Sequence, residues 1–181
     1  MAIVHKKLTY EDLLETPDDG KRYEIIDGEL YVSAAPFTKH QRAVWNFIDF
    51  FKDAERAGYG RGYSAPTDVM FDEYNVVEPD LLFVLAENRA VIKEANIQGA
   101  PDILVEVLSS STRKRDAGVK MQLYARFGVR FYYIIDPEDE TVQPYELAES
   151  DYRELPLLKG QDAITCPLFP GISMPVSKLF A

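Results

Sequence analysis

Leu81-Leu-Phe-Val-Leu85 and Ile103-Leu-Val-Glu-Val-Leu108 are the two stretches that decide the fold. Apart from Glu106, both are apolar at every position, which is typical of central strands that are covered on both faces of a sheet. Similar apolar runs occur before and after them. The predicted strands are Gly62–Phe71, Pro79–Leu85, Pro101–Leu108 and Val129–Ile135.

Helices are predicted between these strands and before them. Apolar residues recur at helical spacing between a cap in Thr38–Gln41 and Gly58, which predicts a long helix over about residues 39–57. A second helix should begin at a cap near Ser111 or Thr112 and end at Gly128. Thr9 resembles the first residue of a capping box and opens a short helix that Pro17 should end.

The N-terminal part also contains a predicted hairpin. Asp27-Gly28 separates two apolar runs within Arg22–Val32, and this dipeptide tolerates the positive φ angles of a tight turn. Residues beyond Pro137 indicate short strands and turns. We therefore predict one α/β domain over residues 1–181, with a mixed central β-sheet flanked by helices, an N-terminal hairpin and short C-terminal strands.

Composition excludes several classes of protein. The 181 residues are 46% hydrophobic, which suits a folded domain with a sizeable core. Neither a signal peptide nor a membrane span is recognisable, so we expect a cytoplasmic protein without a membrane partner. Cys166 is the single cysteine, which excludes an internal disulfide, and the absence of CxxC and HExxH pairs argues against a zinc site.

The charge is strongly acidic overall but unevenly distributed. Lys and Arg number 20 against 30 Asp and Glu, a net charge of −10 that argues against a protein that coats nucleic acid nonspecifically. From Arg113 to Arg130, however, six basic residues face only Asp116. The segment from Asp136 to Glu154 is acidic, and we interpret it as a solvated hairpin.

Two acidic residues at apolar strands are candidates for chemistry. Burying the isolated carboxylate of Glu106 costs several kcal/mol unless a cation, a metal or hydrogen bonds compensate. Asp80 stands at the edge of a neighbouring apolar strand, and two carboxylates on adjacent strands suit Mg²⁺. If they share a metal site, the pKa of at least one should be raised when the metal is absent. The alternative is structural: Asp80 caps its strand, and Glu106 pairs with a buried Lys or Arg.

Lys120 favours the metal hypothesis. On a helical wheel centred on Ala117, with Met121 and Tyr124 in the buried stripe, Lys120 lies about 60° to one side. Its stem could therefore reach the sheet while the ammonium group stays near solvent. A lysine beside two metal-binding carboxylates can stabilise charge in phosphodiester hydrolysis, although a lone lysine at a helix boundary is usually only a surface side chain. We expect Lys120→Met to cost little stability.

An ordered set of segments resembles a known family. The segments are Tyr23–Leu30, Pro36–Gln41, Glu78–Val84, Asp102–Thr112, Arg115-Asp116, Lys120, Tyr124, Gly128-Val129 and Tyr132–Pro137. Together they resemble the Uma-type endonucleases, once defined only as a domain of unknown function, within the PD-(D/E)XK superfamily of restriction-endonuclease-like nucleases. The similarity extends from about Tyr10 to the C-terminus.

The resemblance implies a restriction-endonuclease-like core with Asp80 and Glu106 as ligands to Mg²⁺ or Mn²⁺. The backbone carbonyl of Val107 would join them, as the corresponding residue does elsewhere in the superfamily. One departure is Leu108, which replaces the usual lysine two residues after the glutamate. Lys120 on the following helix is then the position that matches the catalytic lysine.

Glu24 and His40 also match the pattern of this family. Glu24 could be a third acidic contact to metal or water, or it could pair with Lys21 or Arg22. His40 falls on the apolar face of its helix, so it is either catalytic or a packed, hydrogen-bonded histidine. Asp68 has the same ambiguity and ranks lower.

Our leading hypothesis is a Mg²⁺-dependent DNA endonuclease with Arg113, Lys114 and Arg115 on backbone phosphates. One alternative is a DNA-binding or accessory module that keeps the nuclease fold without turnover. Leu108 at the usual lysine position and the acidic net charge would be consistent with it. Another is a hydrolase of a small phosphate ester. A homodimer would suit the cutting of duplex DNA, but no sequence feature establishes one.

Overall fold

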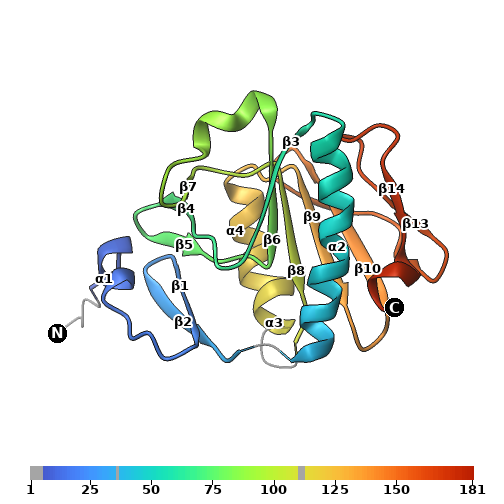
Figure 1. The fold of residues 1–181 in the computed structure, drawn as a ribbon. Helices are drawn as coiled ribbons and strands as arrows, with labels where there is room; N and C mark the ends of the chain where they lie inside the picture. The colour runs from blue at the N-terminus through green and yellow to red at the C-terminus, as the bar shows by residue number, and fades with distance from the viewer. Residues whose placement is uncertain (1–5, 36, 110–112) are drawn as a thin grey trace.

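The structure is a computed structural model and describes residues 6–35, 37–109 and 113–181. Its centre is a mixed sheet with the strand order β11-β10-β9-β8-β6-β3 (Figure 1). Strands β8 and β9 are parallel, and the other neighbours on this path are antiparallel. The strands are β3 (Gly60–Ser64), β6 (Leu81–Leu85), β8 (Ile103–Val107), β9 (Phe131–Asp136), β10 (Thr141–Ala148) and β11 (Asp151–Glu154), with β12 (Leu158–Lys159) paired to β10.

A smaller sheet contains the N-terminal hairpin and has the order β2-β1-β5-β4-β7. The predicted hairpin is confirmed, with Asp27 and Gly28 in the turn at φ angles of 53° and 83°. The short helix α1 (Tyr10–Leu14) follows Thr9, as predicted, and packs beside this sheet. The strands are β1 (Arg22–Ile26), β2 (Glu29–Ser33), β4 (Val69–Asp72), β5 (Asn75–Val77) and β7 (Ile97–Gln98).

The prediction of one strand over Gly62–Phe71 is wrong. Strand β3 ends at Ser64 in the larger sheet, and β4 begins at Val69 in the smaller one. Pro66 lies between them and has no backbone N–H to donate to a sheet. The chain therefore passes from one sheet to the other within the predicted strand.

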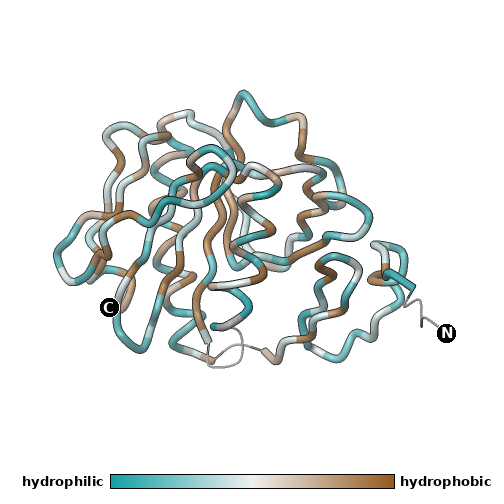
Figure 2. The backbone as a smooth tube through the Cα atoms, turned by 180° about the vertical axis from the view of Figure 1, so that it is seen from behind, coloured by the Kyte–Doolittle hydropathy of each residue, from teal (hydrophilic) through white to brown (hydrophobic). Residues whose placement is uncertain are grey.

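Helices cover both faces of the larger sheet, and each face has its own apolar core (Figure 1). Helix α2 (Thr38–Arg56) packs Phe47 and Phe51 against one face, together with the C-terminal strands β13 (Ala163–Thr165) and β14 (Ser173–Pro175). Helix α4 (Met121–Arg126) and the smaller sheet cover the other face. Figure 2 shows hydrophobic residues recurring along the central strands and hydrophilic stretches in the outer loops. The predicted central strands are thus buried on both sides.

The structure also contains the 3₁₀ helices η1 (Ala86–Val91) and η3 (Val176–Leu179). Phe37 holds the N-cap position of α2, and Thr38 is the first residue of that helix rather than its cap. Within the described residues, none of the helices combines the length and apolar character that crossing a membrane requires.

The second predicted helix contains an unexpected π-helical segment. Helix α3 (Arg113–Arg115) continues through the π-helical segment η2 (Asp116–Lys120) into α4, which ends before Gly128. The proposed cap at Ser111 or Thr112 lies outside the described residues. A π segment takes more residues per turn than an α-helix, so it changes which side chains face the sheet. Asp116 and Lys120 are buried and Ala117 is exposed, so the wheel centred on Ala117 is wrong.

Gly60→Ala should destabilise the fold, because an added Cβ would lie 2.1 Å from the carbonyl oxygen of Val84 on the neighbouring strand. We expect a loss of about 1–3 kcal/mol in the free energy of unfolding, as for other overpacked sites. Urea denaturation of the wild type, Gly60→Ala and Gly118→Ala measures this. Gly118 is the matched control because its added Cβ would meet nothing within 4 Å. Equal stability of all three proteins would contradict the packing at β3.

Candidate functional site

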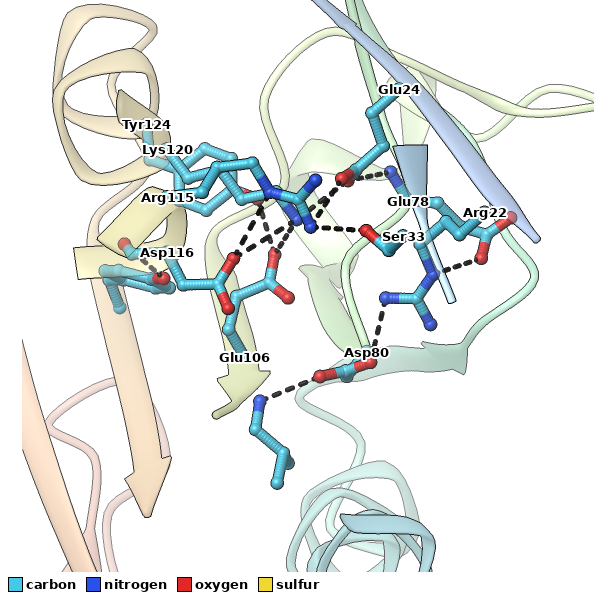
Figure 3. Close-up of polar contacts among 12 residues, drawn as sticks. Arg22, Glu24, Ser33, Glu78, Asp80, Glu106, Arg115, Asp116, Lys120 and Tyr124 are labelled. Carbon is cyan, nitrogen blue, oxygen red and sulfur yellow. Dashed lines mark hydrogen bonds and ion pairs between the residues drawn. The ribbon is translucent and has the colours of Figure 1, made fainter. Parts of the chain in front are cut away.

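Asp80 and Glu106 lie side by side at the junction of strands β6 and β8. Leu81 pairs with Val105 in the antiparallel register, and Asp80 and Glu106 are the next residues along each strand. Both side chains are buried, with 2% exposure each. Figure 3 shows the two carboxylates in one network with residues from the hairpin and from the α3–α4 helix. The structure thus brings together the two leading candidates.

The Asp80 carboxylate is held by donors from separate parts of the chain. The Arg22 guanidinium lies 3.0 Å from its Oδ1, His40 Nε2 lies 3.0 Å from its Oδ2, and the Val107 backbone N–H donates to Oδ2 at 2.7 Å. Burial raises the pKa of Asp80, but the hydrogen bond from His40 and the charge of Arg22 outweigh burial and lower this pKa to about 2. Asp80 is therefore a carboxylate at neutral pH. His40, at 7% exposure, is packed and hydrogen-bonded to this carboxylate.

Glu106 is bound by a buried cation and a buried phenol. Lys120 Nζ and the hydroxyl of Tyr124 donate to its Oε1 at 2.8 Å and 2.7 Å. Burial raises the pKa of Glu106 to about 8 despite the opposing charge of Lys120, and Asp116 and Asp80 add to the rise. The expected raised pKa is confirmed, although burial rather than repulsion from Asp80 is its main cause. The structural alternative, pairing of Glu106 with a buried lysine, is also observed, and that lysine is Lys120.

Lys120, like Glu24, is completely buried. Its side chain has 0% exposure, so the expectation that its ammonium stays near solvent is wrong. The π-helical segment directs it inward, where Nζ lies 2.7 Å from Glu24 Oε1 and 2.8 Å from Glu106 Oε1. Burial lowers the pKa of Lys120, but the Glu106 and Glu24 carboxylates raise it above its ordinary value. The group is therefore a permanent cation at neutral pH.

Glu24 connects the hairpin to this helix. Besides Lys120, it accepts a hydrogen bond from the Glu78 backbone N–H at 3.0 Å, and Arg115 Nη2 lies 3.3 Å from its Oε2. Burial raises the pKa of Glu24, but the charges of Lys120 and Arg115 lower it below its ordinary value. Of the alternatives open from the sequence, pairing with Lys21 or Arg22 is not observed: Lys21 pairs with Asp19, and Arg22 with Glu78 and Asp80.

The basic residues of the Arg113–Arg115 helix face different surroundings. Arg113 is half exposed and pairs with Asp136 at 2.6 Å. Arg115 is 12% exposed and is directed inward, where it donates to Ser33 at 2.7 Å and pairs with Glu24. The side chain of Lys114 lies outside the described part of the chain. Arg115 is therefore committed to the buried network, whereas Arg113 remains at the surface.

Sequence reasoning missed Arg22 and Tyr124 as members of the site and left Asp68 ambiguous. Tyr124 follows Lys120 by one helical turn, so its spacing was a usable signal. Arg22 gave no signal, because its contact with Asp80 joins residues 58 positions apart. Asp68 lies between β3 and β4, and burial and the charge of Glu24 raise its pKa.

The donor set fits a hard divalent cation. Among the described residues, no three Asp, Glu, His or Cys side chains are grouped closely enough to enclose a metal ion by themselves. Mg²⁺ does not require such an enclosure, since it is usually held by one or two carboxylates and keeps several waters. Asp80 and Glu106, on adjacent strands, supply that number of carboxylates. The residues therefore fit Mg²⁺ better than a metal that needs a closed protein cage.

The sequence model of Uma2, described as putative restriction endonuclease, matches residues 10–177. The chain belongs to the Uma2 family. No curated protein matches it.

The fold of this Uma2 protein is also found in a solved structure. It is similar to the crystal structure of a putative nuclease belonging to DUF820 from Anabaena variabilis, with a TM-score of 0.78 and 17% sequence identity. The similarity covers 96% of this chain and 97% of that one. The expected mixed α/β fold is confirmed.

Lys120→Met should destabilise the protein strongly, against the expectation from sequence. Removing the ammonium leaves the buried Glu24 carboxylate without its nearest cation and Glu106 without one of its hydrogen-bond donors, and breaking a buried pair costs about 3–5 kcal/mol. Urea denaturation measures this, with Lys52→Met as control because Lys52 is exposed on α2. The control should change stability by less than about 0.5 kcal/mol. A Lys120→Met protein as stable as the control would contradict the buried bridge.

Glu106 should make stability depend on pH. The folded protein keeps the Glu106 proton up to a pKa of about 8, whereas the unfolded chain releases it near 4.5. Wild-type stability should therefore fall as the pH rises from about 5 to about 8, and Glu106→Gln should lack this part of the fall. Denaturation of both proteins across this range gives the difference. Parallel curves would mean that Glu106 has an ordinary pKa in the folded state.

Proposed function

We propose that this Uma2 protein is a Mg²⁺-dependent endonuclease that hydrolyses phosphodiester bonds of DNA. The observation that carries the proposal is the position of Lys120, whose ammonium contacts Glu106 while Asp80 lies beside Glu106 on the adjacent strand. Two carboxylates and a lysine are the groups that metal-assisted phosphodiester hydrolysis requires. The family description supports the reaction class.

Asp80, Glu106 and the backbone carbonyl of Val107 are the groups that would hold the metal. When bound, Mg²⁺ would polarise the phosphate and lower the pKa of an attacking water. Asp80 is already ionised, and the hydrogen bond from the Val107 N–H keeps its carboxylate beside strand β8. Glu106 holds a proton at neutral pH, which it would release when a second cation joins Lys120.

Lys120 supplies positive charge to the reacting phosphate rather than acting as a base. Its pKa is raised, so it stays protonated, and an ammonium group with this environment can only donate hydrogen bonds. Leu108, at the usual lysine position, is 8% exposed and lies in the apolar core. The positive charge beside Glu106 therefore comes from Lys120 on the helix instead of from a lysine at the end of strand β8.

Nicking of supercoiled plasmid by the purified protein tests the reaction. We expect nicking that requires Mg²⁺ or Mn²⁺ and falls at least 100-fold in Asp80→Asn, by analogy with the loss of a single group that stabilises the transition state. Asp49→Asn is the matched control, because Asp49 is an exposed aspartate on α2 that pairs with Lys178. Circular dichroism confirms that each variant is folded.

Two outcomes would contradict the proposed function. Nicking that is equal in Asp80→Asn and Asp49→Asn would assign the activity to another site or to a contaminant. A folded wild type that binds DNA but never nicks it with any divalent metal would favour the accessory-module alternative.

Arg113 lies at the surface of this helix and should contact a DNA phosphate. Replacing Arg113 by Ser should weaken binding to every DNA sequence and reduce the slope of log affinity against log salt by about 0.9. Arg115→Ser is unsuitable for this test because Arg115 holds Glu24. Fluorescence anisotropy with labelled DNA at several salt concentrations measures the slope, and an unchanged slope would move the DNA contact elsewhere.

A further inference from the structure

A cavity opens beside Asp80, on the side of the network that Arg22 and His40 border. It has a volume of about 180 Å³ and contains Asp80 together with residues of α2, β1 and β3. Ser64 and Ala65 form part of its wall next to Asp80, because Ser64 pairs with Leu81 and the Ala65 N–H donates to the Asp80 carbonyl at 3.0 Å. Arg22 adds a positive charge at the carboxylate. The cavity is thus a polar recess that leads to one of the two candidate metal ligands.

Helix α2 contributes an aromatic wall to this cavity. Gln41, Val44, Trp45 and Ile48 line it and follow the spacing of one helix face. Trp45 is 68% exposed, although the opposite face of α2 buries Phe47 and Phe51 in the core. The fold therefore does not need this indole, and its ring borders the entrance to Asp80.

We propose that this cavity binds one unpaired nucleotide of the DNA strand, with its base stacked on Trp45 and its phosphate directed toward Arg22 beside Asp80. The proposal rests on the proposed function and narrows its substrate class to single-stranded or locally opened DNA. An indole offers a flat apolar face, and bases stack on such faces with little dependence on sequence. Gln41, one turn before Trp45, can donate to and accept from the edge of that base.

Burial of the carboxylates favours an unpaired nucleotide over an intact duplex. Asp80 and Glu106 are each only 2% exposed, so a phosphate must enter a recess to reach them. A duplex is a wide rod that offers the edges of its bases in the grooves and keeps their faces stacked inside. A single strand is narrow and exposes the faces of its bases, on which the indole of Trp45 can stack.

Trp45 is the only tryptophan of the chain, so its fluorescence reports on this cavity alone. The wild-type protein is titrated without divalent metal, first with a single-stranded oligothymidylate and then with a hairpin-free duplex of the same length. We expect saturable quenching by the single strand and much weaker quenching by the duplex. Anisotropy of labelled oligonucleotide measures the total binding in parallel.

Variants separate stacking from other binding. Trp45→Ala should weaken single-strand affinity by about 5- to 150-fold, the range that loss of one stacked base predicts, whereas Trp45→Phe should retain most of the affinity. Leu14→Ala is the matched control, because Leu14 is 67% exposed on α1 and does not line the cavity. It should bind and quench like the wild type.

Several results would overturn the proposal. These are binding of the single strand without quenching, no binding at all, equal quenching by duplex and single strand, and equal affinity of Trp45→Ala and Leu14→Ala. If the Trp45 fluorescence falls as the protein concentration rises, without DNA, the cavity surface would instead bind a second copy of the chain. The titration needs neither metal nor turnover. If single-stranded DNA quenches the Trp45 fluorescence but the protein never nicks plasmid, the result would support this inference and contradict the proposed function.

Discussion

The ammonium of Lys120 connects the N-terminal hairpin to the central sheet from inside the protein. It lies 2.7 Å from Glu24 on the hairpin and 2.8 Å from Glu106 on the central sheet, with no exposure to solvent. A buried carboxylate such as Glu24 costs several kcal/mol unless a cation compensates for its lost hydration. Lys120 therefore helps to hold the hairpin over the sheet, together with the contacts of Arg115 with Glu24 and of Arg22 with Asp80.

The π-helical segment makes this bridge available. Asp116 and Lys120 are both buried, and Ala117 between them is exposed. Tyr124 follows on the same inner face and donates to Glu106 at 2.7 Å. π segments occur frequently at functional sites because they redirect a side chain without ending the helix. Here the segment directs Lys120 toward Glu106. In related nucleases, a lysine at the position of Leu108, at the end of the strand, would serve this purpose.

The sequence was sufficient for the elements that depend on local patterns. Continuous apolar runs predicted the central strands around Asp80 and Glu106, and Asp27-Gly28 predicted the hairpin. Local patterns failed where the outcome depends on distant partners: Pro66 divides a predicted strand between two sheets, and a regular helical wheel misplaced Lys120. Glu24 and His40 were found through resemblance to a family, whereas Arg22 was missed because its partner Asp80 is distant in the chain.

We propose that Asp80 and Glu106 hold a divalent metal beside the buried Lys120. A crystal structure of the wild-type protein soaked with Mn²⁺ tests it most directly, because the anomalous signal of manganese locates the ion independently of the protein atoms. Our account predicts one strong anomalous peak in contact with both carboxylates, with Lys120 still hydrogen-bonded to Glu24. Unchanged Asp80 and Glu106 without a peak between them at saturating Mn²⁺ would contradict the account.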